Sequence, residues 1–158
     1  MRVNRRFGLA ALTGTVVAGA ALLVGCDGVG GGDATGGTLH LASDTGRPSV
    51  PVDDGWVAVL PADDDATWAL LDANPGVDLT HANLRMDSGD VVGVGGLWQP
   101  VAGGRFELPA DPGEYVLCFV VPAESGPGVV RGCAPVTLTD GARVAATWGE
   151  AGFRATVR

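Results

Sequence analysis

The hydrophobic pattern divides the chain into two parts. A continuous apolar stretch runs from Leu9 to Val24 without a charged residue, and three arginines but no acidic residue precede it. Beyond residue 37 the apolar residues come in short runs, many alternating with polar residues and bounded by Gly, Pro, Asn and Asp. Short alternating runs are typical of strands with one buried face. The sequence therefore predicts an N-terminal export segment followed by an all-β domain.

Most of the second part divides into short predicted strands. Residues 46–52 favour a loop or an edge strand because they contain two prolines, and residues 66–71, which follow three aspartates, fit either a short helix or a strand. Residues 72–90 show turn signals but no clear periodicity. Strands of this length at short spacing are typical of a β-sandwich. The predicted strands are 38–42, 55–60, 91–94, 104–109, 114–121, 129–133, 135–139, 142–148 and 153–157, with a hairpin turn at Asp140-Gly141.

One predicted hairpin brings two cysteines together. A hairpin centred on Ser125-Gly126 places Val120 opposite Arg131 and Cys118 opposite Cys133, and directly opposed residues lie within disulfide distance. The spacing of these cysteines is not that of a Cys-x-x-Cys redox or metal pair, and no histidine is near them in sequence. We therefore expect a disulfide that closes a loop of about 15 residues and contributes roughly 3 kcal/mol of stability.

The apolar N-terminal stretch ends in Leu23-Val24-Gly25-Cys26, which resembles the bacterial lipobox. The resemblance implies cleavage before Cys26, a diacylglyceryl group on its thiol and acylation of the new amine. Two or three acyl chains hold a protein to a bilayer, whereas one does so only marginally. The stretch itself is shorter than the roughly 20 residues that a spanning helix needs. The expected organisation is a signal peptide (1–25), a lipid-anchored Gly-rich tether (26–37) and a β-sandwich (38–158) on the extracytoplasmic face of the cell membrane. The alternative is an ordinary signal peptide that contains a cysteine.

The export route is open between two systems. Residues 4–9 are similar to a twin-arginine signal, but Gly8 stands where that signal usually has a large apolar residue. The general route is therefore favoured. Abundant Gly and Ala, together with Arg but no Lys, are typical of high-GC bacteria such as actinobacteria.

The expected mature chain is strongly acidic. Without residues 1–25 it carries seven arginines against 18 acidic residues, a net charge of −11, and it contains no lysine. Such a surface is expected to repel nucleic acid and anionic lipid headgroups, so nucleic-acid binding is excluded. The apolar fraction of the whole 158-residue sequence, 46%, is that of a globular protein.

A second resemblance concerns the fold. The run Gly104-Arg105-Phe106-Glu107-Leu108, followed by Pro112-Gly113-Glu114-Tyr115-Val116-Leu117, resembles the "G-x-F-x-L … P-G-x-Y-x-L" core of carboxypeptidase-regulatory-like, transthyretin-like sandwiches. Residues 136–141 are similar to the closing strand and turn of that family, whereas residues 61–100 do not fit it. The resemblance implies an antiparallel, Ig-like or transthyretin-like sandwich. It also implies a non-catalytic role in adhesion, carbohydrate binding or support of other domains, and it transfers no functional residue.

Few residues point to chemistry. The chain lacks the spacings of nucleophile-elbow, metalloprotease, phosphate-loop and calcium-loop motifs, and we expect no cofactor. The carboxylates of Asp63, Asp64, Asp65, Asp87 and Asp90 are weak candidates for calcium, which prefers several oxygen ligands; such acidic groups more often start helices or lie in solvated loops. His81 is interpreted as a surface-loop histidine.

Trp98 is the main candidate for ligand binding. It lies between glycines and a proline, a context that favours exposure. An exposed tryptophan stacks on sugar rings or anchors protein partners; alternatively, Trp98 covers one end of the sandwich. The leading hypothesis is a non-enzymatic, membrane-anchored module that binds an envelope protein or another envelope component. The alternatives are a carbohydrate-binding module and, less favoured, a hydrolase.

Overall fold

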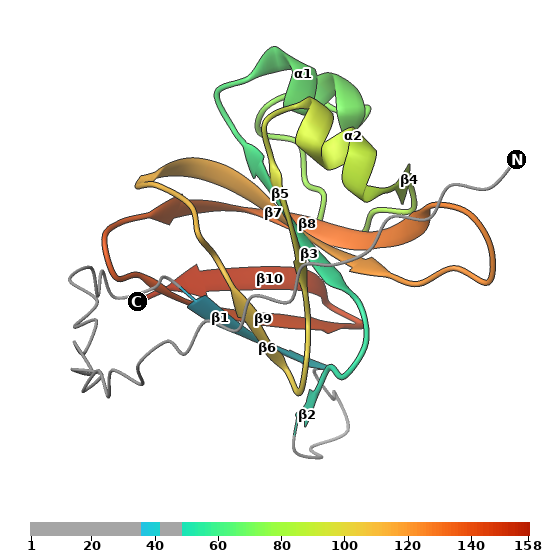
Figure 1. Cartoon of the computed structure of the whole chain (residues 1–158), viewed down its shortest axis with the longest axis vertical. Helices are drawn as coiled ribbons and strands as arrows, with labels where there is room; N and C mark the ends of the chain where they lie inside the picture. Colours follow the sequence, from blue (N-terminus) through green and yellow to red (C-terminus); the bar gives the residue numbers. More distant parts are fainter. Residues whose placement is uncertain (1–35, 42–48) are drawn as a thin grey trace, which may run out of the picture. The chain divides into compact units, whose positions relative to one another are not determined.

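Two five-stranded sheets and two short helices make up the residues that the computed structural model describes, 36–41 and 49–158 (Figure 1). The first sheet has the order β10-β9-β1-β2, and β6 also pairs with β1. It consists of β1 (Gly36–Leu41), β2 (Val50–Pro51), β6 (Arg105–Glu107), β9 (Arg143–Gly149) and β10 (Gly152–Val157). The second sheet has the order β4-β8-β7-β3-β5. It consists of β3 (Trp56–Pro61), β4 (Arg85–Met86), β5 (Leu97–Pro100), β7 (Gly113–Val121) and β8 (Gly128–Leu138).

The predicted all-β sandwich is confirmed, with one departure from antiparallel pairing. β1 runs parallel to β9 along its whole length, while the other strand pairings are antiparallel. The predicted hairpin turn at Asp140-Gly141 is wrong. The chain changes sheets there, with Gly141 at a φ of 69°, and β9 enters between β10 and β1 instead of pairing with β8. The predicted strand start at Thr38 is also corrected, because β1 begins at Gly36.

β8 joins two predicted strands into one. The sequence suggested a break near Pro135, but the strand continues through it, with Pro135 opposite Val116 of β7. Proline cannot donate to a ladder and is tolerated where its nitrogen faces no partner strand. β4 pairs with β8 only at Val129 and Gly128, so the outer side of β8 has no strand partner at Pro135.

The predicted cysteine pair is confirmed, although part of the predicted register is wrong. Cys118 and Cys133 lie directly opposite each other, with Cα atoms 4.0 Å apart, and form a disulfide. Nearer the loop, Val120 pairs with Val130 instead of Arg131. A β-bulge accounts for the difference, since it gives β8 one more residue than its partner strand. Simple counting from the loop centre therefore gave the correct pair at the cysteines but not beside Arg131.

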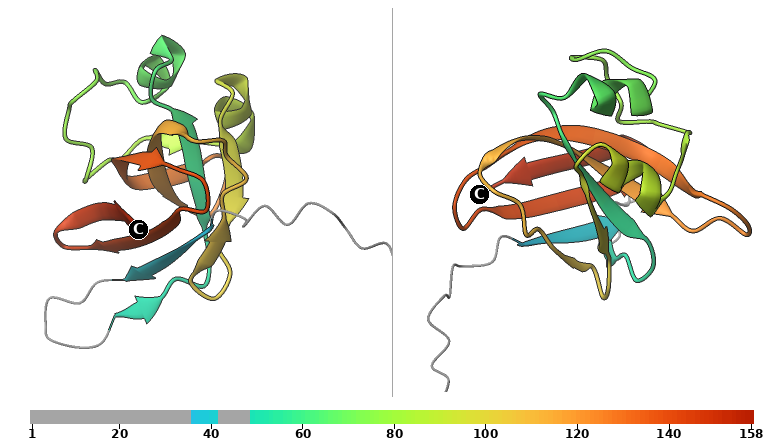
Figure 2. Two further views of the ribbon diagram at one scale, coloured as in Figure 1. Left: turned by 90° about the vertical axis from the view of Figure 1, so that its left-hand side faces the viewer. Right: turned by 45° about the horizontal axis from the view of Figure 1, so that its top comes forward.

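The second sheet is buried on both faces. Its inner face packs against the first sheet around residues such as Val57, Phe119 and Phe153. Its outer face carries a second apolar cluster that includes Leu60, Val116 and the disulfide. Residues 62–96 cover this outer face and contain α1 (Asp65–Leu70) and α2 (Ser88–Gly93). Figures 1 and 2 show both helices on the side of the second sheet that faces away from β1, β9 and β10. We call residues 62–96 the helical cap.

Aspartate side chains start both helices of the cap. Asp64 caps α1 by accepting a hydrogen bond from the Ala66 amide at 2.8 Å. Asp87 and Asp90 form a capping box at the start of α2: Asp87 accepts from two amides of the first turn, and Asp90 accepts from the Asp87 amide at 2.9 Å. These bonds satisfy amides that a helix start leaves without intrahelical partners. The prediction of a strand at 91–94 is therefore wrong, because α2 occupies most of this stretch.

Leu79 and Thr80 together link the two sheets at one side of the sandwich. The Leu79 carbonyl accepts a hydrogen bond from the Cys133 amide of β8, and the Thr80 carbonyl accepts one from the Phe153 amide of β10, each at 2.7 Å. Gly132 and Gly152 allow this close approach, because a Cβ atom at either position would collide with Thr80.

Replacing Gly132 with alanine should destabilise the protein. The added Cβ would lie 2.6 Å from the Phe153 Cβ and would also meet the Thr80 carbonyl. Overpacking of this kind costs about 1–3 kcal/mol. Urea unfolding should show the decrease, and Gly93→Ala is the control. Gly93 is helical and has open space around it, so alanine there should be neutral or stabilising by about 0.5–1 kcal/mol. Equal stability of the two variants would contradict the proposed close packing.

Removing the disulfide should lower the free energy of unfolding by about 2–4 kcal/mol, since the bond closes a loop of 15 residues. The comparison is between the native chain and the double variant Cys118→Ala/Cys133→Ala. Reduction of the native chain should give a similar loss, which separates the effect of the bond from that of the substitutions. A native chain that is insensitive to reductant would contradict the prediction.

Candidate functional site

Trp98 lies on the outer face of the second sheet and stacks on Trp56. It occupies β5, an edge strand, opposite Ala58 of β3. The two indole rings have centroids 5.4 Å apart and an interplanar angle of 29°. Both side chains are half-buried and pack against the second apolar cluster. Trp98 therefore combines the two roles considered from the sequence: it helps to cover the sandwich, and it leaves part of its surface exposed.

The stacked pair is suited to binding a flat or apolar group. Its position at a sheet edge gives access from the side of the molecule, and the packing against Trp56 holds the Trp98 ring in place. A rigid aromatic side chain loses little conformational entropy when a sugar ring or a partner side chain stacks on it. Sequence reasoning identified Trp98 but treated Trp56 as core packing alone. Successive side chains of β3 point to opposite faces, so Trp56 lies on the same face as Ala58. This alternation is the sequence signal from which the position of Trp56 could have been predicted.

A small apolar pocket lies on the same face of the sheet, beside the disulfide. Its volume is about 90 Å³. Trp68 forms one wall, and its Nε1 atom donates to the Ala62 carbonyl at 2.8 Å, which fixes the ring. The residues that line the pocket are Trp68, Val77, Asp78, Leu79, Thr80, Val116, Cys133, Ala134 and Pro135. This pocket could not be predicted from the sequence, because residues 72–90 show no periodicity that would place them against β7 and β8.

Asp78 gives this pocket a negative charge. Its carboxylate accepts a hydrogen bond from the Thr80 amide at 2.9 Å. Hydrogen bonds from Thr80 are the main cause that lowers the pKa of Asp78, with smaller contributions from His81 and Arg154. Asp78 is therefore ionised at neutral pH. An apolar pocket with a carboxylate in its lining suits an apolar side chain that lies next to a cation.

The aspartates considered as calcium ligands lie at the N-terminal ends of two different helices. Asp63, Asp64 and Asp65 lie at the beginning of α1, and Asp87 and Asp90 at the beginning of α2. Three of these carboxylates already accept amide hydrogen bonds. Within residues 36–41 and 49–158, no group of three or more His, Cys, Asp or Glu side chains is placed to hold a metal ion. The visible role of Asp64, Asp87 and Asp90 is helix capping.

His81 and the described serines do not share an element. His81 is exposed in the segment between α1 and β4, Ser49 precedes β2, Ser88 begins α2, and Ser125 lies in the loop between β7 and β8. The hydroxyl of Tyr115 donates to the Asp111 carbonyl at 2.9 Å. Burial is the main cause that raises the pKa of Tyr115. Tyr115 thus secures the turn that precedes β7.

No model of a known protein family, no curated protein and no solved structure matches this chain. The resemblances to the lipobox and to the transthyretin-like sandwiches therefore remain predictions. In the part of the chain that the structure describes, neither helix is long and apolar enough to cross a membrane.

Replacing Asp87 with alanine should reveal the role of the carboxylates at α2. Loss of an N-cap costs about 0.5–2 kcal/mol, so thermal unfolding should shift to lower temperature. Added calcium should leave the melting temperature of the native chain unchanged if the carboxylates serve only as caps. A rise that grows with calcium concentration, and that Asp87→Ala abolishes, would instead establish a calcium site.

Proposed function

We propose that this protein is a lipoprotein of the cell membrane, which holds a non-enzymatic β-sandwich on the extracytoplasmic face to bind an envelope protein. The anchor would be Cys26 of the lipobox-like sequence. The disulfide between Cys118 and Cys133 supports export, because structural disulfides persist in oxidising compartments and are rare in the reducing cytosol. With Cys26 lipidated, the chain would have no free thiol.

The observation that carries the binding proposal is the half-exposed pair of Trp56 and Trp98 beside an acidic cap. Tryptophan is enriched among the residues that dominate binding energy at protein interfaces, where it is surrounded by more polar contacts. The apolar pocket by Trp68 lies on the same side of the second sheet and offers a second anchor point.

The charge of the helical cap indicates the kind of partner. Residues 62–96 contain seven aspartates and a single arginine, Arg85. All seven aspartates are exposed. They are Asp63, Asp64, Asp65, Asp72, Asp78, Asp87 and Asp90. A surface of this charge attracts and orients a partner with a basic surface. We therefore propose a partner protein that presents Lys or Arg side chains around an apolar or aromatic contact.

Carbohydrate binding is the second candidate, and the same tryptophan pair favours it. Trp98 rests on Trp56 and is partly exposed at the sheet edge. A pyranose ring could stack on the accessible part of such a platform. In this case binding would depend on Trp98 and would respond little to the charges of the helical cap.

The anchor is tested by the intact mass of the native protein extracted with detergent. We expect a chain that begins at Cys26 and carries a diacylglyceryl group, with or without an additional acyl chain. The variant Cys26→Ala should lose the adduct and the membrane association. An unmodified chain in the culture medium would contradict the anchor.

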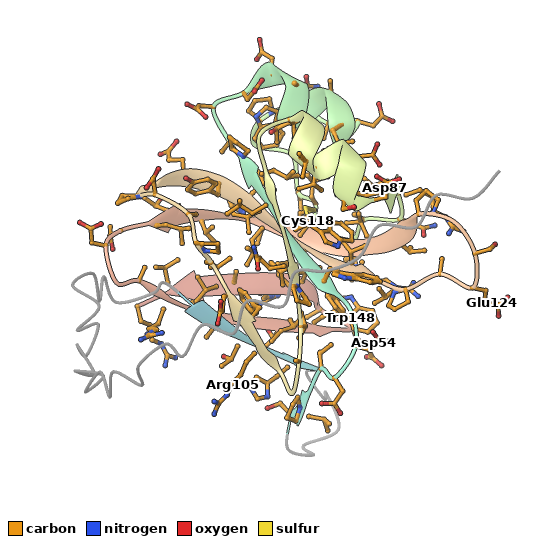
Figure 3. All side chains as sticks on the ribbon, in the orientation of Figure 1. Asp54, Asp87, Arg105, Cys118, Glu124 and Trp148 are labelled. Carbon is orange, nitrogen blue, oxygen red and sulfur yellow. A yellow bond between two sulfur atoms is a disulfide. The ribbon has the colours of Figure 1, made fainter. Side chains whose placement is uncertain are left out.

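The partner is tested by crosslinking on intact cells, followed by affinity purification and mass spectrometry. Asp63→Asn/Asp65→Asn should weaken capture of a basic partner, because it removes two exposed charges from the cap and leaves the Asp64 cap in place. The matched control is Asp53→Asn/Asp54→Asn, which changes the charge equally between β2 and β3; Figure 3 shows Asp54 away from the helices.

Trp98→Ala should reduce capture more strongly than either double variant. A partner recovered equally with all variants would contradict the proposed site. Loss with Trp98→Ala alone, together with a positive signal for the native chain in a glycan-binding screen, would favour the carbohydrate alternative.

A further inference from the structure

The outer face of the first sheet carries an unusual concentration of arginines. Residues that point inward on its strands, such as Leu39, Val144 and Phe153, are buried between the sheets. The alternate positions face outward, because successive side chains of a strand point to opposite faces. The outward positions include four arginines, Arg105, Arg143, Arg154 and Arg158, and three threonines, Thr38, Thr147 and Thr156, and all seven residues are exposed.

Strand pairing brings these residues together from distant parts of the sequence. Thr38 of β1 lies between Arg105 of β6 and Ala145 of β9. Two residues earlier on β9, Arg143 pairs with Arg158 through two backbone hydrogen bonds of 2.9 Å. Directly opposed residues in a sheet point to the same face. The four arginines on this face are most of the six among the described residues, Arg85 and Arg131 being the other two. We call this surface the arginine face.

A groove of about 380 Å³ crosses the arginine face at the start of β1. Its floor is low because the outward positions of Gly36 and Ala145 carry no side chain or only a methyl group, and arginines line it. The lining residues are Gly36, Gly37, Thr38, Arg105, Arg143, Val144, Ala145 and Arg158. Guanidinium groups bind phosphate oxygens through paired N–H donors, and a threonine hydroxyl adds a further donor.

Nearby acidic residues offset only part of this charge. Glu107 is the one acidic residue within the strands of the first sheet. It lies on β6 at an outward position opposite Gly36. Arg154 is within electrostatic reach of Asp78, and Arg143 already interacts with another group of the chain. The positive charge available to a ligand on this face therefore comes mainly from Arg105 and Arg158.

We propose that the arginine face rests on the anionic headgroups of the membrane that anchors the chain. This inference builds on the proposed lipid anchor at Cys26. Between Cys26 and the start of β1 at Gly36 there are nine residues, so the groove cannot lie farther than about 35 Å from the anchored residue. Tethering raises the effective concentration of headgroups at the face, and weak contacts then suffice to orient the domain.

The opposite side of the sandwich supports the same orientation. The helical cap covers the outer face of the second sheet, while the arginine face is the outer face of the first, so acidic and basic surfaces lie on opposite sides. Figure 3 shows Asp87 on the helical side and Arg105 on the far side. An anionic membrane repels the cap and attracts the arginine face. The acidic chain as a whole is thus expected to repel such lipids, but one of its faces attracts them.

The test uses the lipidated full-length product, purified from membranes and reconstituted into vesicles of phosphatidylcholine with or without phosphatidylglycerol. A nitroxide is attached to Thr156→Cys on the arginine face or to Asp65→Cys on the cap. Cys118 and Cys133 form the disulfide and Cys26 would carry the lipid, so the introduced cysteine is the one thiol available for labelling. Nickel chelated to lipid headgroups relaxes a nitroxide only at close range. We expect strong relaxation of the label at residue 156 in vesicles that contain phosphatidylglycerol, and little in vesicles without it. The label at residue 65 should show no strong relaxation in either. Added salt should weaken the relaxation at residue 156, because it screens the charges.

Charge reversal supplies the matched comparison. Arg105→Glu/Arg158→Glu should remove the phosphatidylglycerol-dependent signal at residue 156, because each arginine lost lowers the affinity for anionic headgroups about fivefold or more. Arg85→Glu/Arg131→Glu changes the net charge equally on the second sheet and should retain the signal. Equal relaxation of the two labels, or no dependence on phosphatidylglycerol, would overturn the proposal. A signal seen in native membranes but not in lipid vesicles would also overturn it, because the occupant would then be another envelope component.

Different results would contradict the proposal of the lipid anchor and the proposal about the arginine face. If the lipidated chain co-floats with the vesicles but the label at residue 156 shows no contact with headgroups, only the role of the arginine face is overturned. A chain whose mass shows no lipid overturns the anchor. In that case Cys26 is a free thiol, and coupling it to a maleimide lipid allows the same relaxation experiment to decide the role of the arginine face.

Discussion

The second sheet has apolar side chains on both faces, and the rest of the fold follows from the need to cover both. In β7 the residues from Val116 to Val120 are all buried, and β3 is buried just as completely from Val57 to Leu60. A sheet of this kind needs a layer on each side. The first sheet supplies one layer. The helical cap supplies the other, and it also positions Trp68 and the pocket beside the disulfide. The pocket and the acidic side chains of the proposed binding surface therefore belong to the cover that keeps this sheet out of water, whereas Trp56 and Trp98 belong to the sheet itself.

The sequence predicted what depends on local pattern. The strand at 114–121 has a strong apolar signal, and the register of the following hairpin led to the Cys118–Cys133 bond. The helix α2 was missed, because Val91, Val92 and Val94 favour strands while the capping box at Asp87 favours a helix. The crossover at Asp140-Gly141 looks like a hairpin turn in sequence, because a turn signal does not specify which sheet the next strand joins.

The candidate surfaces depend on contacts that pattern alone does not contain. Trp98 was recognisable from its Gly and Pro neighbours, but its stacking on Trp56 depends on the pairing of β5 with β3. The arginine face is harder still to predict. Its arginines come from β6, from β9, and from β10 and the residue that follows it, and the strongly negative net charge suggests no basic surface. Only the register that places β1 between β6 and β9 brings Arg105 near Arg143.

The central position of β1 has a mechanical consequence. β1 pairs with β9 along one side and with β6 and β2 along the other. Tension applied to Gly36 along the axis of this strand would act against the neighbours on both sides. It would load the hydrogen bonds on both sides in shear, all at once, instead of opening them one after another as at a peeled edge strand. The central position of β1 therefore resists extraction of this strand along its own axis.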